Sequence, residues 1–260
     1  MSSEKPLVYL ILGAAGSGRR EVVADLIDGG LAEGDKAVVL LSTGEAPSAH
    51  DEKLGTQKRW TLMEGMISAP EDALVGATHI FLVADGRGNP VDQIEAFKPW
   101  VDVNGGELGR VICVVNCRLA EQHRELIAWY EACIHFSDVV LLACREGVAN
   151  KWMSDFQNRF KDQFFPCHFE LLKAGRVKNP ALILDPQPRR MSHYFDEADW
   201  LVDGADAEDD VEMGEGDDDE PMDGEEEEVE VTQAEDPYME RLAGGHRIKV
   251  IPDIAKFLES

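Results

Sequence analysis

The sequence contains no run of about 18 consecutive apolar residues, the length that a membrane-spanning helix requires. The opening residues Met1–Pro6 (MSSEKP) lack the charged and then apolar order of a secretory signal peptide, and they lead directly into a short apolar segment. We therefore expect a protein without membrane association that resides in the cytoplasm.

The chain has five cysteines, an odd number that cannot all pair in disulfide bonds. Most of them lie inside apolar runs, where cysteine behaves as a small hydrophobic residue, so reduced core cysteines are expected. Cys113 and Cys117 would fall on one face of a strand, without partner ligands beside them, whereas structural zinc needs about four ligands. This pattern predicts no metal-binding residue.

Basic residues are absent from Asp196 to Asp236, a segment with 22 aspartates and glutamates. Most of the formal net charge of −26 lies there, and the remainder of the chain has 29 acidic against 25 basic residues. Because contacts with nucleic-acid phosphates need clustered lysine and arginine, no nucleic-acid partner is expected. The stretch 191–236 has few apolar residues and several glycines, so it is predicted to be an acidic, largely disordered insert.

What the sequence does contain is an alternation of apolar segments and helical patterns. Leu7–Leu12 (LVYLIL) is an uninterrupted apolar run, typical of a strand that is buried on both faces of a parallel sheet. Arg20–Leu31 follows with apolar residues at helical spacing. This order favours an α/β fold, a three-layer P-loop NTPase-like parallel sheet with helices on both faces. The alternation predicts further strands at Lys36–Ser42, His79–Ala84, Arg110–Cys117 and Asp138–Cys144, and helices at Arg59–Ser68, Leu119–Phe136 and Asn150–Phe164.

Four regions are expected along the chain. Residues 1–165 form the P-loop NTPase-like domain, and residues 166–190 form a short extension with strands at His168–Ala174 and Ala181–Leu184. The acidic insert occupies residues 191–236. Residues 237–260 are expected to be ordered, because His246–Pro252 has the pattern of a strand and Asp253–Leu258 that of a short helix.

The candidate chemistry lies in the turn between the first strand and the first helix. Gly13–Arg20 (GAAGSGRR) has the two glycines of a Walker A phosphate loop at the correct separation and in the correct context. Glycines allow the backbone amides to turn inward, and the start of the helix adds the positive end of its dipole, so both favour an anionic phosphate. The alternative is a glycine-rich turn that merely joins a strand to a helix. The candidate nucleotide-binding residues of the loop are Gly13, Ala14, Ala15, Gly16, Ser17, Gly18, Arg19 and Arg20.

Two residues of the loop depart from the Walker A consensus. Arg19 stands where a lysine reaches the β and γ phosphates; it keeps the charge but is planar and larger. Arg20 replaces the serine or threonine whose hydroxyl binds Mg²⁺, and arginine has no acceptor atom for a cation. The loop is thus compatible with nucleotide binding, while Mg²⁺ binding is left open.

Beyond this loop, the order of motifs resembles the CobW group of GTPases, which includes HypB and UreG. The resemblance rests on Val83–Pro90 (VADGRGNP), Val114–Cys117 (VVNC) and Ser137–Glu146 (SDVVLLACRE), which follow the loop in the family's order and approximate spacing. It extends over about Leu7 to Phe165. It implies a domain that binds a purine nucleotide and, for an intact member of the family, hydrolyses GTP.

The same segments differ from the family at functional positions. Val83 stands where the family has a glutamate, so Asp85 or Asp138 is the nearest candidate carboxylate for Mg²⁺. Ala143–Glu146 (ACRE) replaces the Asn-Lys-x-Asp that reads guanine, although its last residue keeps a carboxylate that could accept from the base. The family's Cys-x-Cys-Cys metal motif, expected near Leu54–Met63, is absent, which argues against metal delivery by those ligands.

These observations lead to one expected function and one alternative. We expect a CobW-like protein that binds a purine nucleotide, GTP or ATP, with weak or lost hydrolysis, in which Asp85 and Glu146 join the loop residues at the site. The alternative is a pseudo-GTPase scaffold whose acidic insert binds a basic protein partner. The sequence assigns no catalytic residue, and it leaves open whether the chain is a degenerate GTPase or no enzyme.

Overall fold

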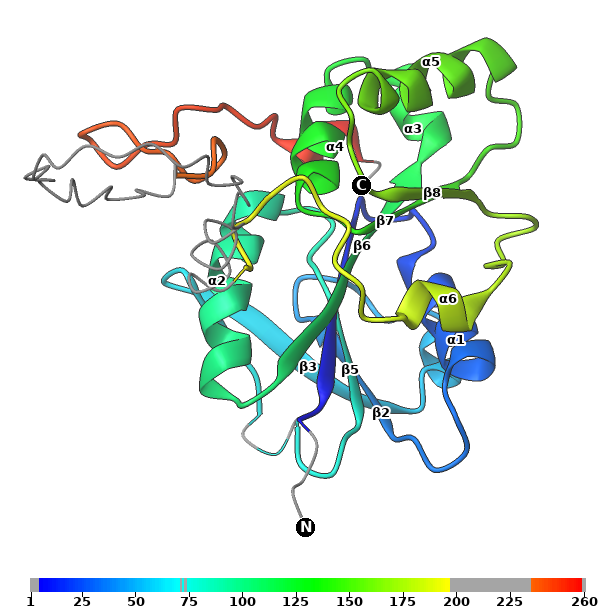
Figure 1. Ribbon diagram of the computed structural model, residues 1–260, viewed down its shortest axis with the longest axis vertical. Coiled ribbons are helices and arrows are strands. Elements are labelled where there is room, and N and C mark those ends of the chain that lie inside the picture. Colours follow the sequence, from blue (N-terminus) through cyan, green and yellow to red (C-terminus); the bar gives the residue numbers. More distant parts are fainter. Residues whose placement is uncertain (1–4, 71, 73, 197–234, 259–260) are drawn as a thin grey trace, which may run out of the picture.

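The computed structural model of the chain describes residues 5–70, 72, 74–196 and 235–258. Eight strands form one sheet in the order β4-β3-β2-β5-β1-β6-β7-β8 (Figure 1). Neighbouring strands run parallel, except that β4 is antiparallel to β3. The predicted α/β, P-loop NTPase-like fold class is confirmed by this topology. The strands are β1 (Leu7–Gly13), β2 (Ala37–Ser42), β3 (Thr56–Met63), β4 (Met66–Ser68), β5 (His79–Val83), β6 (Glu107–Asn116), β7 (Val139–Ala143) and β8 (His168–Leu171).

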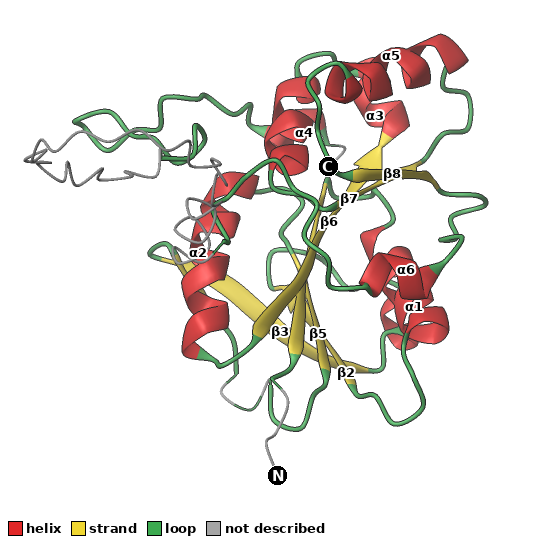
Figure 2. Cartoon of the chain, in the orientation of Figure 1, coloured by secondary structure: helices red, strands yellow, loops and turns green. Residues whose placement is uncertain are grey.

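Helices cover both faces of the sheet (Figure 2). The residues of β1 alternate between two buried cores: Val8, Leu10 and Leu12 pack toward one set of helices, and Tyr9 and Ile11 toward the other. Because both faces of the sheet are covered, the sequence of this strand is apolar without interruption. One face is covered by α1 (Arg19–Gly30) and α6 (Pro180–Leu184), and the other by α2 (Pro90–Val103), α3 (Cys117–Gln122), α4 (Leu126–His135) and α5 (Asn150–Lys161).

The segment expected as a helix at Arg59–Ser68 is instead the antiparallel hairpin of β3 and β4, so that prediction was wrong. Its turn consists of Glu64 and Gly65, whose φ values of 51° and 75° are both positive, as a two-residue hairpin turn requires. In β3, Trp60 is buried and donates a hydrogen bond from Nε1 to Val83 O at 3.0 Å. This contact fixes the hairpin to the central part of the sheet.

Three other expectations on secondary structure were wrong. Ala181–Leu184 lies in helix α6, because Asn179 caps a new helix there. His246–Pro252 contains an isolated bridge residue instead of a strand. The helix expected at Leu119–Phe136 is divided into α3 and α4, with an extended residue, His123, at the end of α3.

The C-terminal segment is fixed on the face that carries α4. The carboxylate of Asp236 lies 2.8 Å from Nε2 of His135, and it accepts hydrogen bonds from Ser192 Oγ and from the amide of Tyr238. The bond between Ser192 and Asp236 joins the two sides of the segment 197–234, to which most of the predicted acidic insert belongs and which lies outside the described residues. Within the described ranges, no helix has the length and apolar character needed to cross a membrane.

Candidate phosphate-binding site

Strand β1 ends and helix α1 begins within the candidate phosphate loop, at the carboxyl edge of the sheet. Gly13, Gly16 and Gly18 have positive φ values of 140°, 76° and 88°. Gly18 is the N-cap of α1, and it has no side chain that could accept from the first amides of the helix. The loop is therefore curled rather than extended, and the start of the helix is uncapped.

One side of the loop faces open space. The amides of Gly16 and Gly18 have no acceptor among the described residues, and a Cβ atom on either glycine would meet no atom within 4 Å. The amide of Ala15, in contrast, donates to Gly86 O at 3.0 Å, which brings the turn after β5 against the loop. Two loop amides thus remain available to an anion.

Ala14 and Ser17 form the inner side of the loop. Both are fully buried, and neither lines the pocket in front of the loop. Ser17 Oγ has no hydrogen-bond partner among the described residues. These two residues pack the loop onto the sheet instead of facing a ligand.

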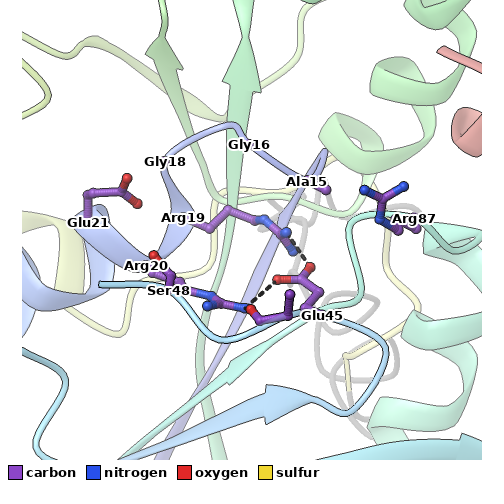
Figure 3. Close-up of a pocket in the computed structure, with 10 residues that line it drawn as sticks. Ala15, Gly16, Gly18, Arg19, Arg20, Glu21, Glu45, Ser48 and Arg87 are labelled. Carbon is purple, nitrogen blue, oxygen red and sulfur yellow. Dashed lines mark hydrogen bonds and ion pairs between the residues drawn. The ribbon is translucent and has the colours of Figure 1, made fainter. Parts of the chain in front are cut away.

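Arg19, in the position of the Walker lysine, is buried and points toward the turn after β5 (Figure 3). Its guanidinium donates hydrogen bonds to Ala84 O and to Oε1 of Glu45. Glu45 follows β2, and the same oxygen accepts the amide of Gly86 at 2.9 Å. The positive charge that would reach a phosphate is therefore paired with a carboxylate of the protein itself.

Arg20, in the position of the Mg²⁺-binding hydroxyl, is also buried. It donates to Asp51 Oδ1 at 2.8 Å, to Glu45 Oε2 at 3.1 Å and to Ala46 O at 2.9 Å. Arg19, Arg20, Glu45 and Asp51 together form a group that we call the loop ion cluster. Its two arginines and two carboxylates balance one another in charge.

Glu45 is ionised in this cluster. Burial by itself would raise the pKa of its carboxyl, but the charge of Arg19, the amide of Gly86 and the charge of Arg20 together hold the pKa below its ordinary value. At neutral pH the carboxylate is therefore a stable internal anion.

A pocket of about 220 Å³ opens between the loop and the ion cluster. Gly16 and Gly18 line one side, Glu45 and Ser48 line another, and the side chain of Arg87 lies across from Glu45 (Figure 3). A second pocket of about 430 Å³ shares Ala15, Gly16 and Arg87 with the first and continues to α3 and the C-terminal segment. The open side of the loop is thus reached from two neighbouring pockets.

The two carboxylates proposed for Mg²⁺ lie in different places. Asp85 follows β5 at the carboxyl edge, where it accepts from Ser42 Oγ at 3.3 Å and from the amide of Arg87 at 2.9 Å. Asp138 precedes β7 and so lies at the opposite edge of the sheet, fully buried, with an ion pair to Arg190. The interpretation of Asp138 as a Mg²⁺ ligand was wrong, because its carboxylate ties β7 to the amide of Val111.

Glu146 is not brought together with the loop. It is exposed in the turn after β7, its main-chain oxygen accepts from Arg118 Nη2 at 2.9 Å, and its side chain lines neither pocket. The residue of this turn that reaches the loop is Cys144, whose Sγ lies 3.9 Å from Gly16 O. A base contact from Glu146 would require the turn to rearrange.

Sequence reasoning missed Glu45 and Asp51. Glu45 comes three residues after the end of β2, and functional groups gather at this edge of a parallel sheet, so its position gave a weak signal. Nothing in the sequence indicates that its side chain reaches two arginines of the loop.

The residues present fit nucleotide phosphates but not Mg²⁺. Phosphates fit because the loop offers free amides at an uncapped helix start. Mg²⁺ requires oxygen ligands, whereas Arg20 occupies the hydroxyl position and Glu45 is already bound to both arginines. In the part of the chain that the structure describes, no group of three or more histidine, cysteine or acidic side chains is arranged to hold a metal ion.

Comparison with solved structures finds chains of low identity. This chain is similar to zinc-bound YjiA GTPase from E. coli (14% identity, covering 72% of this chain and 67% of that chain, TM-score 0.42). It is also similar to HypB from Helicobacter pylori in complex with nickel (13% identity, 68% and 81%, TM-score 0.41). A third is the signal recognition particle receptor FtsY from Elizabethkingia anophelis (15% identity, 70% and 65%, TM-score 0.43). No protein-family model matches the sequence, and no curated protein matches it.

Proposed function

We propose that this chain binds a purine nucleotide, GTP or ATP, at the phosphate loop of residues 13–20, chiefly through the free backbone amides of Gly16 and Gly18, with weak or lost hydrolysis. The observation that carries the proposal is the uncapped start of α1, where the amides of Gly16 and Gly18 face an open pocket. Backbone amides and the helix dipole bind phosphate without help from a lysine, so the substitution by Arg19 does not remove the main binding elements.

Weak hydrolysis is expected because the groups that normally stabilise phosphoryl transfer are altered in this chain. Arg20 supplies no oxygen for Mg²⁺, Val83 supplies no carboxylate, and the charge of Arg19 is paired with Glu45. Phosphoryl transfer depends on electrostatic stabilisation by such groups, so their simultaneous change is expected to slow the reaction severely. Asp85 and Glu146 stay in the proposal as secondary residues. Asp85 shapes the turn after β5 beside the loop by accepting the amide of Arg87, and Glu146 reaches the base only after the turn after β7 rearranges.

Isothermal titration with GTP, GDP, ATP and ADP, each with and without Mg²⁺, tests this function. We expect saturable binding that changes little with Mg²⁺, together with negligible turnover. A Gly16→Val variant places a side chain in the open side of the loop and should lose binding. Gly34→Val is the matched control, because Gly34 also has a positive φ and open surroundings but follows the other end of α1. Absence of binding at millimolar nucleotide would show that the loop is merely a turn.

The alternative function is a pseudo-GTPase scaffold, and the loop ion cluster is the observation that favours it. The two arginines are satisfied by Glu45 and Asp51 without any ligand, as a purely structural loop requires. In this alternative the acidic insert binds a basic protein partner. An Arg19→Ala, Arg20→Ala double variant separates the two functions. Partner binding that survives the substitutions, in a protein that carries no nucleotide, supports the scaffold.

A further inference from the structure

We propose that Glu45 is a built-in competitor for the phosphate site, so that a nucleotide binds by exchanging its terminal phosphate for the Glu45 carboxylate. This inference rests on the proposed function, since it concerns how the same loop is opened. In the free protein, Glu45 occupies the position between Arg19 and Arg20 while the amides of Gly16 and Gly18 stay available. Any polyphosphate of suitable size can perform the exchange.

The carboxylate of Glu45 lies where several hydrogen-bond donors converge. Oε1 of Glu45 accepts from the guanidinium of Arg19 and from the amide of Gly86, and Oε2 accepts from Arg20 at 3.1 Å. These donors come from the start of α1 and from the turn after β5, and they converge on one anion between the two guanidinium groups (Figure 3). Carboxylate and phosphate oxygens are equivalent acceptors for such charge-assisted hydrogen bonds.

Burial makes the exchange selective for anions. The side chain of Arg19 is 4% exposed and that of Glu45 is 9% exposed. If Glu45 simply moved into water, Arg19 would be left as an unpaired buried charge, which is strongly unfavourable. A second anion that takes its place removes this penalty, so the departure of Glu45 and the arrival of a phosphate are coupled.

The exchange also affects the loop that carries Glu45. Residues 43–50 connect β2 to the short 3₁₀ helix Asp51–Lys53, and the side chain of Glu45 links them to the phosphate loop through Arg19 and Arg20. Arg20 and Arg59 hold the same segment by its main chain, through bonds to Ala46 O and Glu45 O. When the Glu45 carboxylate leaves, the segment loses its links to Arg19 and Gly86, while the two main-chain bonds can persist. Phosphate binding is thus converted into a movement of residues 43–50.

The affinity test compares Glu45→Gln with the wild type and uses inorganic tripolyphosphate, ATP and GTP as probes. Glutamine keeps the size of the side chain but removes the competing charge, so tripolyphosphate should bind the variant about tenfold more tightly, which corresponds to about 1.4 kcal/mol. Glu33→Gln is the matched control, because Glu33 is exposed beyond the C-terminal end of α1. Equal or weaker binding to the Glu45 variant overturns the inference.

The outcomes separate the inference from the proposed function. If tripolyphosphate prefers the variant but no nucleotide binds, the inference holds and the nucleotide function fails. If ATP binds both proteins equally, the function holds and the inference fails. If tripolyphosphate, ATP and GTP all fail to bind either protein, both are overturned.

A second measurement does not depend on the stability of the glutamine variant. Hydrogen exchange of residues 43–50 in the wild type should accelerate when tripolyphosphate saturates the protein. Glu45→Asp, whose side chain is one methylene shorter and is therefore expected to weaken the contact with Arg19, should show fast exchange in this segment before the anion is added. Unchanged exchange in the saturated wild type contradicts the coupling.

Discussion

Glu45 neutralises two buried arginines and is itself shielded from water. Such a residue affects stability as well as binding, because each charge in the loop ion cluster depends on its partners. Asp51 completes the cluster through Arg20, and an additional longer contact of 3.7 Å joins it to Arg59. The cluster should therefore respond measurably to the loss of one charge and to a change in pH.

Replacing Glu45 with glutamine should lower the free energy of unfolding at pH 7 by about 3 kcal/mol, since removal of one partner leaves the other charges of a buried pair uncompensated. The pKa of Glu45 in the folded protein lies below its ordinary value of 4.5. The stabilisation is therefore complete above that ordinary value and is lost as the pH falls through the folded pKa. Urea denaturation from pH 7 to about pH 3 should show the two proteins converging. A difference in the free energy of unfolding that does not change with pH would contradict an ionised Glu45 in the folded protein.

Gly86 approaches the phosphate loop so closely that a side chain there is not tolerated. A Cβ atom would collide with the amide nitrogen of Ala15 and with the guanidinium of Arg19. Gly86→Ala should therefore cost about 1–3 kcal/mol of stability and weaken anion binding. Gly244→Ala is the control, because its Cβ would have no neighbour closer than 3.7 Å. If thermal unfolding shows that both variants lose the same stability, Gly86 does not make the close contact with the phosphate loop.

At the scale of elements, burial determines what could be predicted from the sequence. The strands β1, β5 and β7 are covered on both faces, so their apolar runs identify them directly. In β3, Trp60 is the one fully buried position, and the rest is polar or partly exposed, so the segment has no strand signature. The hairpin turn at Glu64 and Gly65 became evident only from its positive φ values.

Helix α2 was not predicted although its local signals are present. Asn89 accepts from the amide of Val91 as an N-cap, and Pro90 occupies the first turn, where proline is favoured. Pro99 lies inside the helix, where proline usually interrupts the pattern, and this conceals the helical spacing.

The candidate site was predictable where it is local in sequence. Residues 13–20 form a continuous motif, so their curled conformation follows from the glycines. The contact between Arg19 and Glu45 joins residues 26 positions apart and depends on how β2 and β5 are placed in the sheet. Asp85 and Asp138 look alike in sequence, but one follows its strand and the other precedes it, so they lie at opposite edges.

The C-terminal segment gives a prediction at this scale. Burial would raise the pKa of Asp236, but the hydrogen bonds from His135 and Ser192 hold it below its ordinary value, so this anchor is present at neutral pH and is lost in acid. Asp236→Asn should weaken the anchor by about 1–3 kcal/mol and accelerate hydrogen exchange in residues 236–257. Asp155→Asn, on the exposed side of α5, is the control. Exchange that stays slow in the first variant would show that apolar packing of Tyr238 and Ile254 suffices.

At the scale of the whole molecule, the order of the strands places the phosphate loop. Strand β1 lies between β5 and β6. The strands β2 to β5 lie on one side of it, and β6 to β8 lie on the other. Ligands of open α/β sheets bind at the carboxyl edge, at the switch point where the strand order reverses. The curled loop, the free amides and the loop ion cluster all lie at this point of the sheet.

Amide NMR during titration with ATP or GTP shows whether the backbone amides at the start of α1 bind the phosphates of a nucleotide. We expect large, saturable shifts for the amides of Gly16, Gly18 and Arg19, with the amide of Gly34 unchanged. Amides of residues 16–19 that do not shift at millimolar nucleotide would contradict the claim.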